Sequence, residues 1–287
     1  MILAGGTENM SQSPFYLANI RNGYKMGEQK VIDSMIKDAL TCAFNNYHMG
    51  VTAENLAKQY NISRQEQDEF ALDSQLKAIK AQENGAFKDE IAPVILKSKK
   101  GESVFENDEY IKKDISLENL SKLRPAFIKD NGSVTAGNSS GINDGAAMLL
   151  LTSKKKAKEL NLSILAKIKA IASVGVEPSI MGIGAAYAAK AVLEKAKFSI
   201  DDMDLVEANE AFAAQSIACL KELNPKHKDR FNVNGGAIAL GHPVGASGAR
   251  ICATLLHEMK RRKAHLGLAT LCVGGGQGIA AIFEGGE

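Results

Sequence analysis

The sequence contains no apolar run long enough to cross a membrane, and its first residues carry neither the basic segment nor the long apolar core of a secretory signal. Its four cysteines, Cys42, Cys219, Cys252 and Cys272, lie far apart, without the spacing of a zinc site or a disulfide framework. Unpaired cysteines are typical of a reducing compartment. We therefore expect a cytoplasmic protein that has no metal site and no membrane partner.

The charges are too evenly spread to predict a nucleic-acid partner. The chain has 35 Lys and Arg against 33 Asp and Glu, a formal net charge of +2, and no basic stripe. Its glycine-rich loops also lack the spacing of a Walker or dinucleotide motif. A phosphate- or nucleotide-binding module is therefore the least favoured class of function.

The hydrophobic content is sufficient for a substantial core. With 287 residues, 45% of them hydrophobic, the chain is long enough for two domains or one large one. Many of its 26 glycines are clustered between apolar segments rather than among serines. Such clusters are typical of backbone that turns sharply or approaches a ligand, and not of a flexible linker.

From about residue 142 onward, apolar strands alternate with amphipathic helices, which predicts an α/β fold with helices layered on a mixed sheet. The last two strands are expected to be antiparallel. The expected strands are 146–151 (buried), 165–172, 205–208, 231–233, 266–273 and 278–283. One helix is expected to begin at Ser153, and further helices are expected at 184–197, 211–223 and 246–262.

The segment from about 12 to 141 is more polar and less periodic. Ser63 and Glu66 have the spacing of a capping box at a helix start, and Gly85 suits the left-handed position that ends that helix. Residues 97–131 are rich in lysine and glutamate, which indicates surface-exposed structure. At the N-terminus, residues 1–4 read as a short buried strand that runs into a glycine pair.

Polar groups lie in three loops at predicted strand ends: 209–213, 241–243 and 272–276. In layered α/β folds such loops meet in one crevice, so these loops are expected to converge. Each key residue also has a structural interpretation. Asn209 is a possible helix N-cap, His242 a turn residue, and Cys272 a buried apolar side chain at a strand end.

Taken together, these loops match one family. Residues 232–250, which contain His242, resemble the histidine signature of thiolases along their whole length, and the order and spacing of further matches agree from the first residue to the last. The closest resemblance is to acetyl-CoA acetyltransferases of the biosynthetic short-chain type. The further matching segments are 4–10, 47–50, 135–145, 209–215 and 272–278.

The resemblance implies a layered thiolase-type αβαβα fold with an incomplete N-terminal half. It divides the chain into three parts. Residues 1–11 and 142–163 would be a remnant of the N-terminal thiolase domain, 12–141 a loop domain covering coenzyme A, and 164–287 the C-terminal thiolase domain. Apolar faces of the remnant would be uncovered, which predicts poor solubility or association of this chain.

By the same resemblance, the strand-end loops carry catalytic groups. Cys272 matches the cysteine that removes or returns a proton at the α-carbon of acetyl-CoA, and His242 matches the histidine that activates the nucleophile and holds a thioester oxygen. Asn209 matches the residue that positions a water in that oxyanion hole. Gly274 would offer a backbone amide to a second one.

The resemblance also implies the substrate. Coenzyme A and acetyl-CoA would be substrates rather than tightly bound cofactors, and His48, Met49, Phe212 and Ser140 would line the pantetheine channel. The reaction would be condensation of two acetyl-CoA or the reverse thiolytic cleavage. The full-length form would be a homodimer or homotetramer that uses acyl-CoA substrates.

One family feature has no counterpart in this chain. Thiolases carry their nucleophilic cysteine on a helix that precedes the strand at residues 4–6, and Cys42, Cys219 and Cys252 lack its sequence context. Two interpretations are therefore open. Either the natural product is longer, contains that cysteine and is an acetyl-CoA acetyltransferase, or the chain is an inactive thiolase fragment or paralogue that retains at most coenzyme A binding.

Overall fold

A four-stranded sheet forms the centre of the molecule. The computed structural model describes residues 1–286. The strand order is β7–β10–β9–β8; β10 pairs antiparallel with both neighbours, as predicted for the last two strands, and β8 runs parallel to β9. The strands are β7 (Ala166–Gly175), β8 (Leu205–Ala208), β9 (Leu266–Val273) and β10 (Gln277–Gly285).

Alternate residues of these strands face two separate cores, as the period of a β-strand requires. One face packs against α5 (Gly184–Ala196) and α6 (Ala213–Leu223), and the other packs against α8 (Ser247–Arg262). The first core contains Val206, Leu268 and Ile282 of the sheet, and the second contains their chain neighbours Leu205, Ala269 and Phe283.

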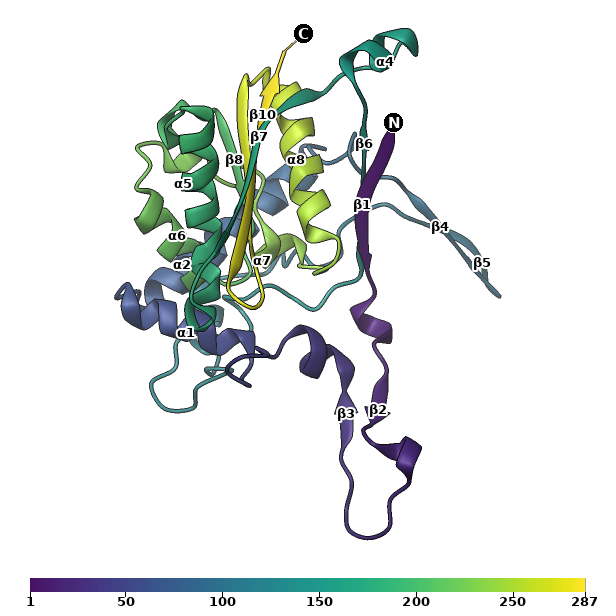
Figure 1. The fold of residues 1–287 in the computed structure, drawn as a ribbon, viewed down its shortest axis with the longest axis vertical. Coiled ribbons are helices and arrows are strands. Elements are labelled where there is room, and N and C mark those ends of the chain that lie inside the picture. Colours follow the sequence, from purple (N-terminus) through teal and green to yellow (C-terminus); the bar gives the residue numbers. More distant parts are fainter. Residues whose placement is uncertain (287) are drawn as a thin grey trace.

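A second, two-stranded sheet covers the far side of α8. In it, β1 (Ile2–Glu8) pairs antiparallel with β6 (Gly145–Leu151). Figure 1 shows the resulting layers, from α5 and α6 through the central sheet and α8 to β1 and β6. This arrangement confirms the predicted α/β class.

The prediction that 146–151 is a buried strand was wrong for half of its side chains. Burial alternates along β6, and Met148 and Leu150 are each more than half exposed. The reason is that α8 covers only one face of this two-stranded sheet. Leu3 of β1, which pairs with Leu150, is exposed on the same side.

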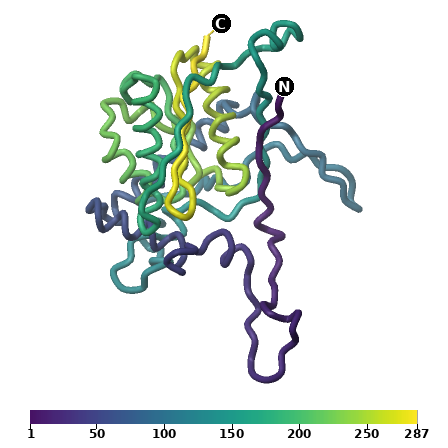
Figure 2. Tube along the Cα trace, in the orientation of Figure 1, coloured from purple at the N-terminus to yellow at the C-terminus, as the bar shows by residue number. Residues whose placement is uncertain are grey.

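Residues 12–141 form helices at the base of the central body and two ribbons that extend from it (Figures 1 and 2). The capping box is confirmed: the Glu66 amide donates to Ser63 Oγ at 3.1 Å, and the Ser63 amide donates to Glu66 Oε2 at 2.7 Å. The helices are α1 (Met49–Gln59), α2 (Arg64–Glu83) and α3 (Leu117–Ser121), and the ribbons are β2 (Phe15–Leu17) with β3 (Val31–Asp33) and β4 (Val94–Ser98) with β5 (Gly101–Phe105).

Two further predictions differ from the structure. Residues 231–233 form no strand, because Asn232 has a left-handed φ of 43° and the backbone turns after a single bridge between Phe231 and Val206. Helix α6 begins at Ala213, two residues later than expected. The remaining α-helices are short: α4 (Lys154–Glu159) begins one residue after the predicted Ser153, which is its N-cap, and α7 is Ala237–Leu240. No helix within residues 1–286 combines the length and the apolar character that a membrane crossing requires.

Candidate active site

Asn209 and His242 meet at the carboxyl end of the central sheet. Asn209 follows β8 directly, and its backbone amide donates to the carbonyl of Thr270 in β9 at 3.0 Å. Its side-chain Nδ2 lies 3.3 Å from Nε2 of His242. The N-cap interpretation of Asn209 was wrong, because the N-cap residue of α6 is Phe212. Asn209 is therefore free to contribute to a site.

The imidazole of His242 is held on both of its nitrogens. Nδ1 lies 2.6 Å from Oγ of Ser247, and that hydroxyl donates to the carbonyl of Pro243 at 2.9 Å. Because the single Ser247 proton is used there, Ser247 Oγ accepts from Nδ1–H. Nε2 is then the unprotonated nitrogen that faces Asn209. The turn-residue interpretation of His242 does not account for this pair of side-chain contacts.

Electrostatics keeps His242 neutral. Burial lowers the pKa of the imidazole to about 4, and the positive charge of Arg250 adds to this effect. A neutral imidazole with its lone pair directed into the site is a proton acceptor at neutral pH. The backbone amide of His242 donates to Asn143 Oδ1 at 3.1 Å, which fixes the loop that carries the ring.

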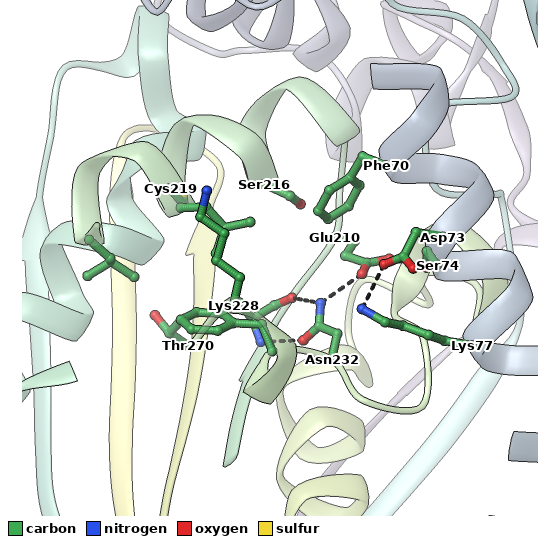
Figure 3. A pocket seen from close by; sticks show the side chains of 14 residues that line it. Phe70, Asp73, Ser74, Lys77, Glu210, Ser216, Cys219, Lys228, Asn232 and Thr270 are labelled. Atoms are coloured by element: carbon green, nitrogen blue, oxygen red, sulfur yellow. Dashed lines mark hydrogen bonds and ion pairs between the residues drawn. The ribbon is translucent and has the colours of Figure 1, made fainter. Parts of the chain in front are cut away.

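Glu210 supports this loop from behind, a role that the sequence reasoning missed. Its buried carboxylate accepts from Ser74 Oγ at 2.6 Å and from Asn232 Nδ2 at 2.8 Å, as Figure 3 shows, and from the Ile238 amide at 3.3 Å. A β-carbon at Gly236 would overlap the carboxylate. Burial raises the pKa of Glu210. The available signal was a carboxylate directly after Asn209 in an otherwise apolar segment.

Cys272 reaches the same edge of the sheet from β9. It is the penultimate residue of that strand and lies two positions after Thr270, the partner of Asn209. Its thiol is buried, and burial raises its pKa to about 12. A thiol in this state carries its proton at neutral pH and can donate it.

The glycine turn after Cys272 contacts the start of α1. A β-carbon at Gly274 would lie 3.2 Å from Cε of Met49, a tight contact that places this turn against the methionine side chain. Met49 itself is buried. Two residues predicted for different roles, oxyanion binding for Gly274 and the pantetheine channel for Met49, are therefore neighbours.

The remaining residues predicted to bind coenzyme A lie close together. His48 caps α1 by accepting from the Gly50 amide at 3.0 Å, and burial lowers its pKa. Its ring stacks on Phe127 at 4.6 Å, and Phe127 meets Phe212 edge-on at 6.0 Å. The Ser140 amide donates to the Ala211 carbonyl at 3.0 Å, next to Phe212.

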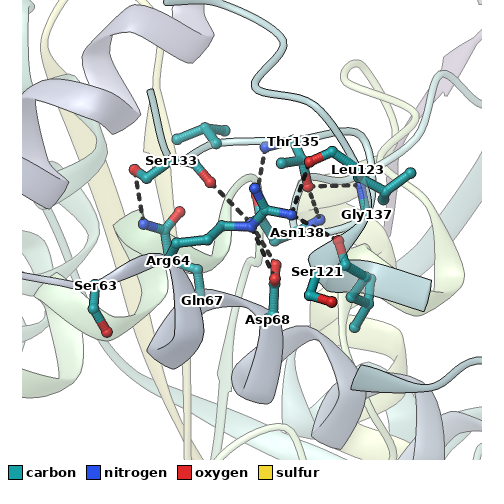
Figure 4. Close-up of polar contacts among 12 residues, drawn as sticks. Ser63, Arg64, Gln67, Asp68, Ser121, Leu123, Ser133, Thr135, Gly137 and Asn138 are labelled. Carbon is teal, nitrogen blue, oxygen red and sulfur yellow. Dashed lines mark hydrogen bonds and ion pairs between the residues drawn. The ribbon is translucent and has the colours of Figure 1, made fainter. Parts of the chain in front are cut away.

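A buried polar network positions the segment that contains Ser140. Arg64 pairs with Asp68 at 2.8 Å, and Asp68 accepts from Asn138 Nδ2 at 2.9 Å (Figure 4). Asn138 Oδ1 accepts in turn from the Thr135 amide at 2.7 Å. Because each group has a partner, the network holds residues 135–140 rigidly against α2.

The other cysteines do not join this site. Cys219 is buried in α6, where its thiol donates to the Gly182 carbonyl at 3.4 Å, and burial raises its pKa to about 11. Cys252 lies within α8, and Cys42 is buried beside Asn45. Within residues 1–286, no cysteine forms a hydrogen bond to His242.

Comparison with known proteins agrees with this geometry. Residues 1–155 match the model of the thiolase N-terminal domain, and residues 162–285 match that of the thiolase C-terminal domain. The chain belongs to the thiolase family. The likeness extends over almost the whole chain, so the site can be compared with thiolases at every position discussed above.

Individual thiolases are similar in both sequence and structure. An acetyl-CoA acetyltransferase of Chromobacterium violaceum is 56% identical over 285 residues, which are 99% of this chain and 72% of that protein. The structure of an acetyl-CoA acetyltransferase from Syntrophomonas wolfei has a TM-score of 0.95 at 44% identity, covering 99% of this chain and 72% of its own. Human mitochondrial 3-ketoacyl-CoA thiolase in complex with CoA has a TM-score of 0.93 at 46% identity, covering 99% and 70%.

Proposed function

We propose that this site transfers acyl groups between coenzyme A thioesters, as an acetyl-CoA acetyltransferase does. The observation that carries the proposal is the pairing of His242 Nε2 with Asn209 Nδ2 at the sheet edge that also carries Cys272. Oδ1 of Asn209 is buried and has no hydrogen-bond partner among the described residues. An orphaned acceptor suits a water that donates one hydrogen to it and the other to a substrate oxyanion.

His242 would act first as a base. Its Nε2 accepts the proton of an attacking thiol, and the thiolate forms a new C–S bond to the thioester carbonyl carbon while the bond to the leaving thiolate breaks. The leaving thiolate takes a proton from the imidazolium. The ring needs Nδ1–H to stay in place during this exchange, which Ser247 ensures by accepting from it.

Cys272 would move the second proton. In cleavage of acetoacetyl-CoA, its thiol gives a proton to the α-carbon as the C–C bond breaks, and in condensation its thiolate removes that proton from acetyl-CoA. A pKa of about 12 matches the proton-donating role at the start of cleavage. Both directions use the same groups. The backbone amide of Gly274 would bind the enolate oxygen.

The polar segment 12–141 would cover coenzyme A, with residues 1–11 and 142–163 belonging to the N-terminal domain and 164–287 to the C-terminal one. The cluster of His48, Phe127 and Phe212 supports this proposal, because it offers apolar ring surface next to the contact between Met49 and Gly274. Pantetheine is a narrow chain with apolar methylenes, which such a surface accommodates. A cytoplasmic homo-oligomer remains part of the proposal.

A second candidate function is coenzyme A binding without turnover. It is favoured by the finding that no cysteine within residues 1–286 forms a hydrogen bond to His242. Acyl transfer through an enzyme-bound acyl group therefore requires a thiol that reaches Nε2 from elsewhere.

Activity and binding assays separate the two candidates. Acetoacetyl-CoA cleavage by the 287-residue chain, with free coenzyme A, is measured beside calorimetric binding of coenzyme A. Turnover that disappears in His242→Asn and Cys272→Ser supports acyl transfer. Binding without turnover supports the second candidate, and absence of both contradicts the proposal for this chain.

A further inference from the structure

A partly open cavity lies beside the strand end that carries Asn209. Its volume is about 140 Å³, and its walls come from α2, α6 and the end of β8 (Figure 3). Ala208 and Glu210, the two chain neighbours of Asn209, both line it, whereas Asn209 does not. The cavity is therefore distinct from the candidate active site and shares one strand end with it.

Most of the cavity wall is apolar. The aromatic rings of Phe70 and Phe231 and the side chains of Leu220 and Leu223 contribute to it. One polar atom is left over: Ser216 Oγ is buried, lines the cavity and has no hydrogen-bond partner among residues 1–286. In Figure 3 this hydroxyl points from α6 into the space beside Phe70. A buried hydroxyl without a partner costs stability, which a bound acceptor would restore.

Most other polar groups of the wall are already paired. Both oxygens of Glu210 accept hydrogen bonds, from Asn232 and from Ser74 with Ile238, and Lys77 pairs with Asp73 at 2.7 Å. Thr270 Oγ1 donates to the Ala185 carbonyl at 2.7 Å. Lys228, the remaining charged residue of the wall, is exposed, so its ammonium can stay hydrated, and the apolar interior favours a neutral molecule.

We propose that this cavity binds a small neutral molecule with an apolar body and one hydrogen-bond acceptor, and that Ser216 donates to that acceptor. The size limits the ligand to about six to ten heavy atoms, since apolar cavities of about 150 Å³ hold benzene.

Phenol and toluene form a matched pair of probes, because they have the same shape and differ in the hydroxyl group. Binding is followed by the ¹³C-methyl signals of Leu220 and Leu223 in the 287-residue chain. Phenol is expected to bind about fivefold more tightly than toluene, the gain from one hydrogen bond. Ser216→Ala is expected to bring the ratio of phenol affinity to toluene affinity to about one. Ser103→Ala, on the exposed strand β5, should retain the wild-type ratio.

The outcome can also overturn the proposal. The proposal fails if millimolar probe shifts neither leucine methyl signal. Ser216 is ruled out as the donor if the preference for phenol over toluene is equal in wild type and Ser216→Ala. Ser216→Leu, which fills the space, must abolish binding; if that variant does not fold, a phenol-soaked crystal of the wild-type chain replaces it. Phenol density within hydrogen-bond distance of Ser216 Oγ supports the site, and density elsewhere, or only water there, overturns it.

Discussion

Nδ2 of Asn209 and Nε2 of His242 lie 3.3 Å apart, although 32 residues separate them in the chain. The amide nitrogen can only donate, so the contact fixes the lone pair of the imidazole toward Asn209. Ser247, on the other side of the ring, fixes the proton. The tautomer of the candidate base is thus set by two side chains that come from different elements.

The tautomer of His242 is expected to depend on Ser247. In Ser247→Ala, Nδ1–H loses its acceptor 2.6 Å away, and the tautomer with the proton on Nε2 gains population. The ¹⁵N shifts of the ring would report a change from one dominant tautomer to a mixture. Unchanged ring shifts in Ser247→Ala would contradict the assignment, and Ser103→Ala serves as a control in an exposed strand.

Stability is expected to fall at acid pH because of His242. Its pKa of about 4 in the folded protein lies below the ordinary histidine value of 6.5, so the unfolded chain binds the proton more readily. The contribution of neutral His242 to the free energy of unfolding is fully present above pH 6.5. It is lost as the pH falls toward 4, by up to about 3 kcal/mol. Urea unfolding at several pH values should show a smaller acid loss in His242→Gln. Equal losses in both proteins would refute this.

Glu207 is expected to lower the stability of the protein as the pH rises, which is opposite to the effect of His242. Burial raises its pKa to about 8, against the partial compensation of Arg250, whose Nη1 lies 3.8 Å from the carboxylate. Because the folded pKa is raised, stability is lost as the pH rises from 4.5 toward 8. Glu207→Gln removes this loss and should be more stable than wild type by about 1–3 kcal/mol at pH 8, relative to pH 5. A pH-independent difference would argue against a titrating Glu207.

Gly236 is expected to tolerate no side chain. The β-carbon of Gly236→Ala would overlap the Glu210 carboxylate, which hydrogen bonds hold in place, so a loss of about 2–4 kcal/mol is expected. Gly248→Ala is the matched control, since its β-carbon would have ordinary contact with Leu271 at 3.8 Å within helix α8. It should be neutral or slightly stabilising. Similar denaturation midpoints for both variants would disprove the steric argument.

The exposed face of β1 and β6 is expected to drive association. Met148 and Leu150 lie on it with Leu3, and contiguous exposed apolar area favours contacts between molecules. Met148→Lys combined with Leu150→Lys should reduce concentration-dependent association in sedimentation velocity. Ile142→Lys, which changes an exposed residue outside the strand pair, should have little effect. A wild-type chain that stays monomeric at high concentration would contradict the expectation.

The sequence by itself determined the local elements and the family. An apolar run predicted strand 266–273 at its observed bounds, and the capping box of Ser63 and Glu66 predicted the start of α2, because both signals lie within a few residues of the chain. The positions of Asn209, directly after a strand, and of Cys272, near the end of one, were also readable from the sequence. The prediction was wrong for His242, which follows helix α7, because the strand expected at 231–233 does not form.

Only the tertiary structure decided which groups meet. The support of Ser247 for His242, the partners of Glu210, the exposure of Met148 and the cavity beside Ser216 depend on packing between elements distant in the chain. Strand 231–233 failed for the same reason: its apolar pattern is local, but the side chain of Asn232 bonds to Ala208 and Glu210 and turns the backbone away. Periodicity shows which face of a helix or strand is apolar. The element that packs against that face is determined by the tertiary structure of the whole chain.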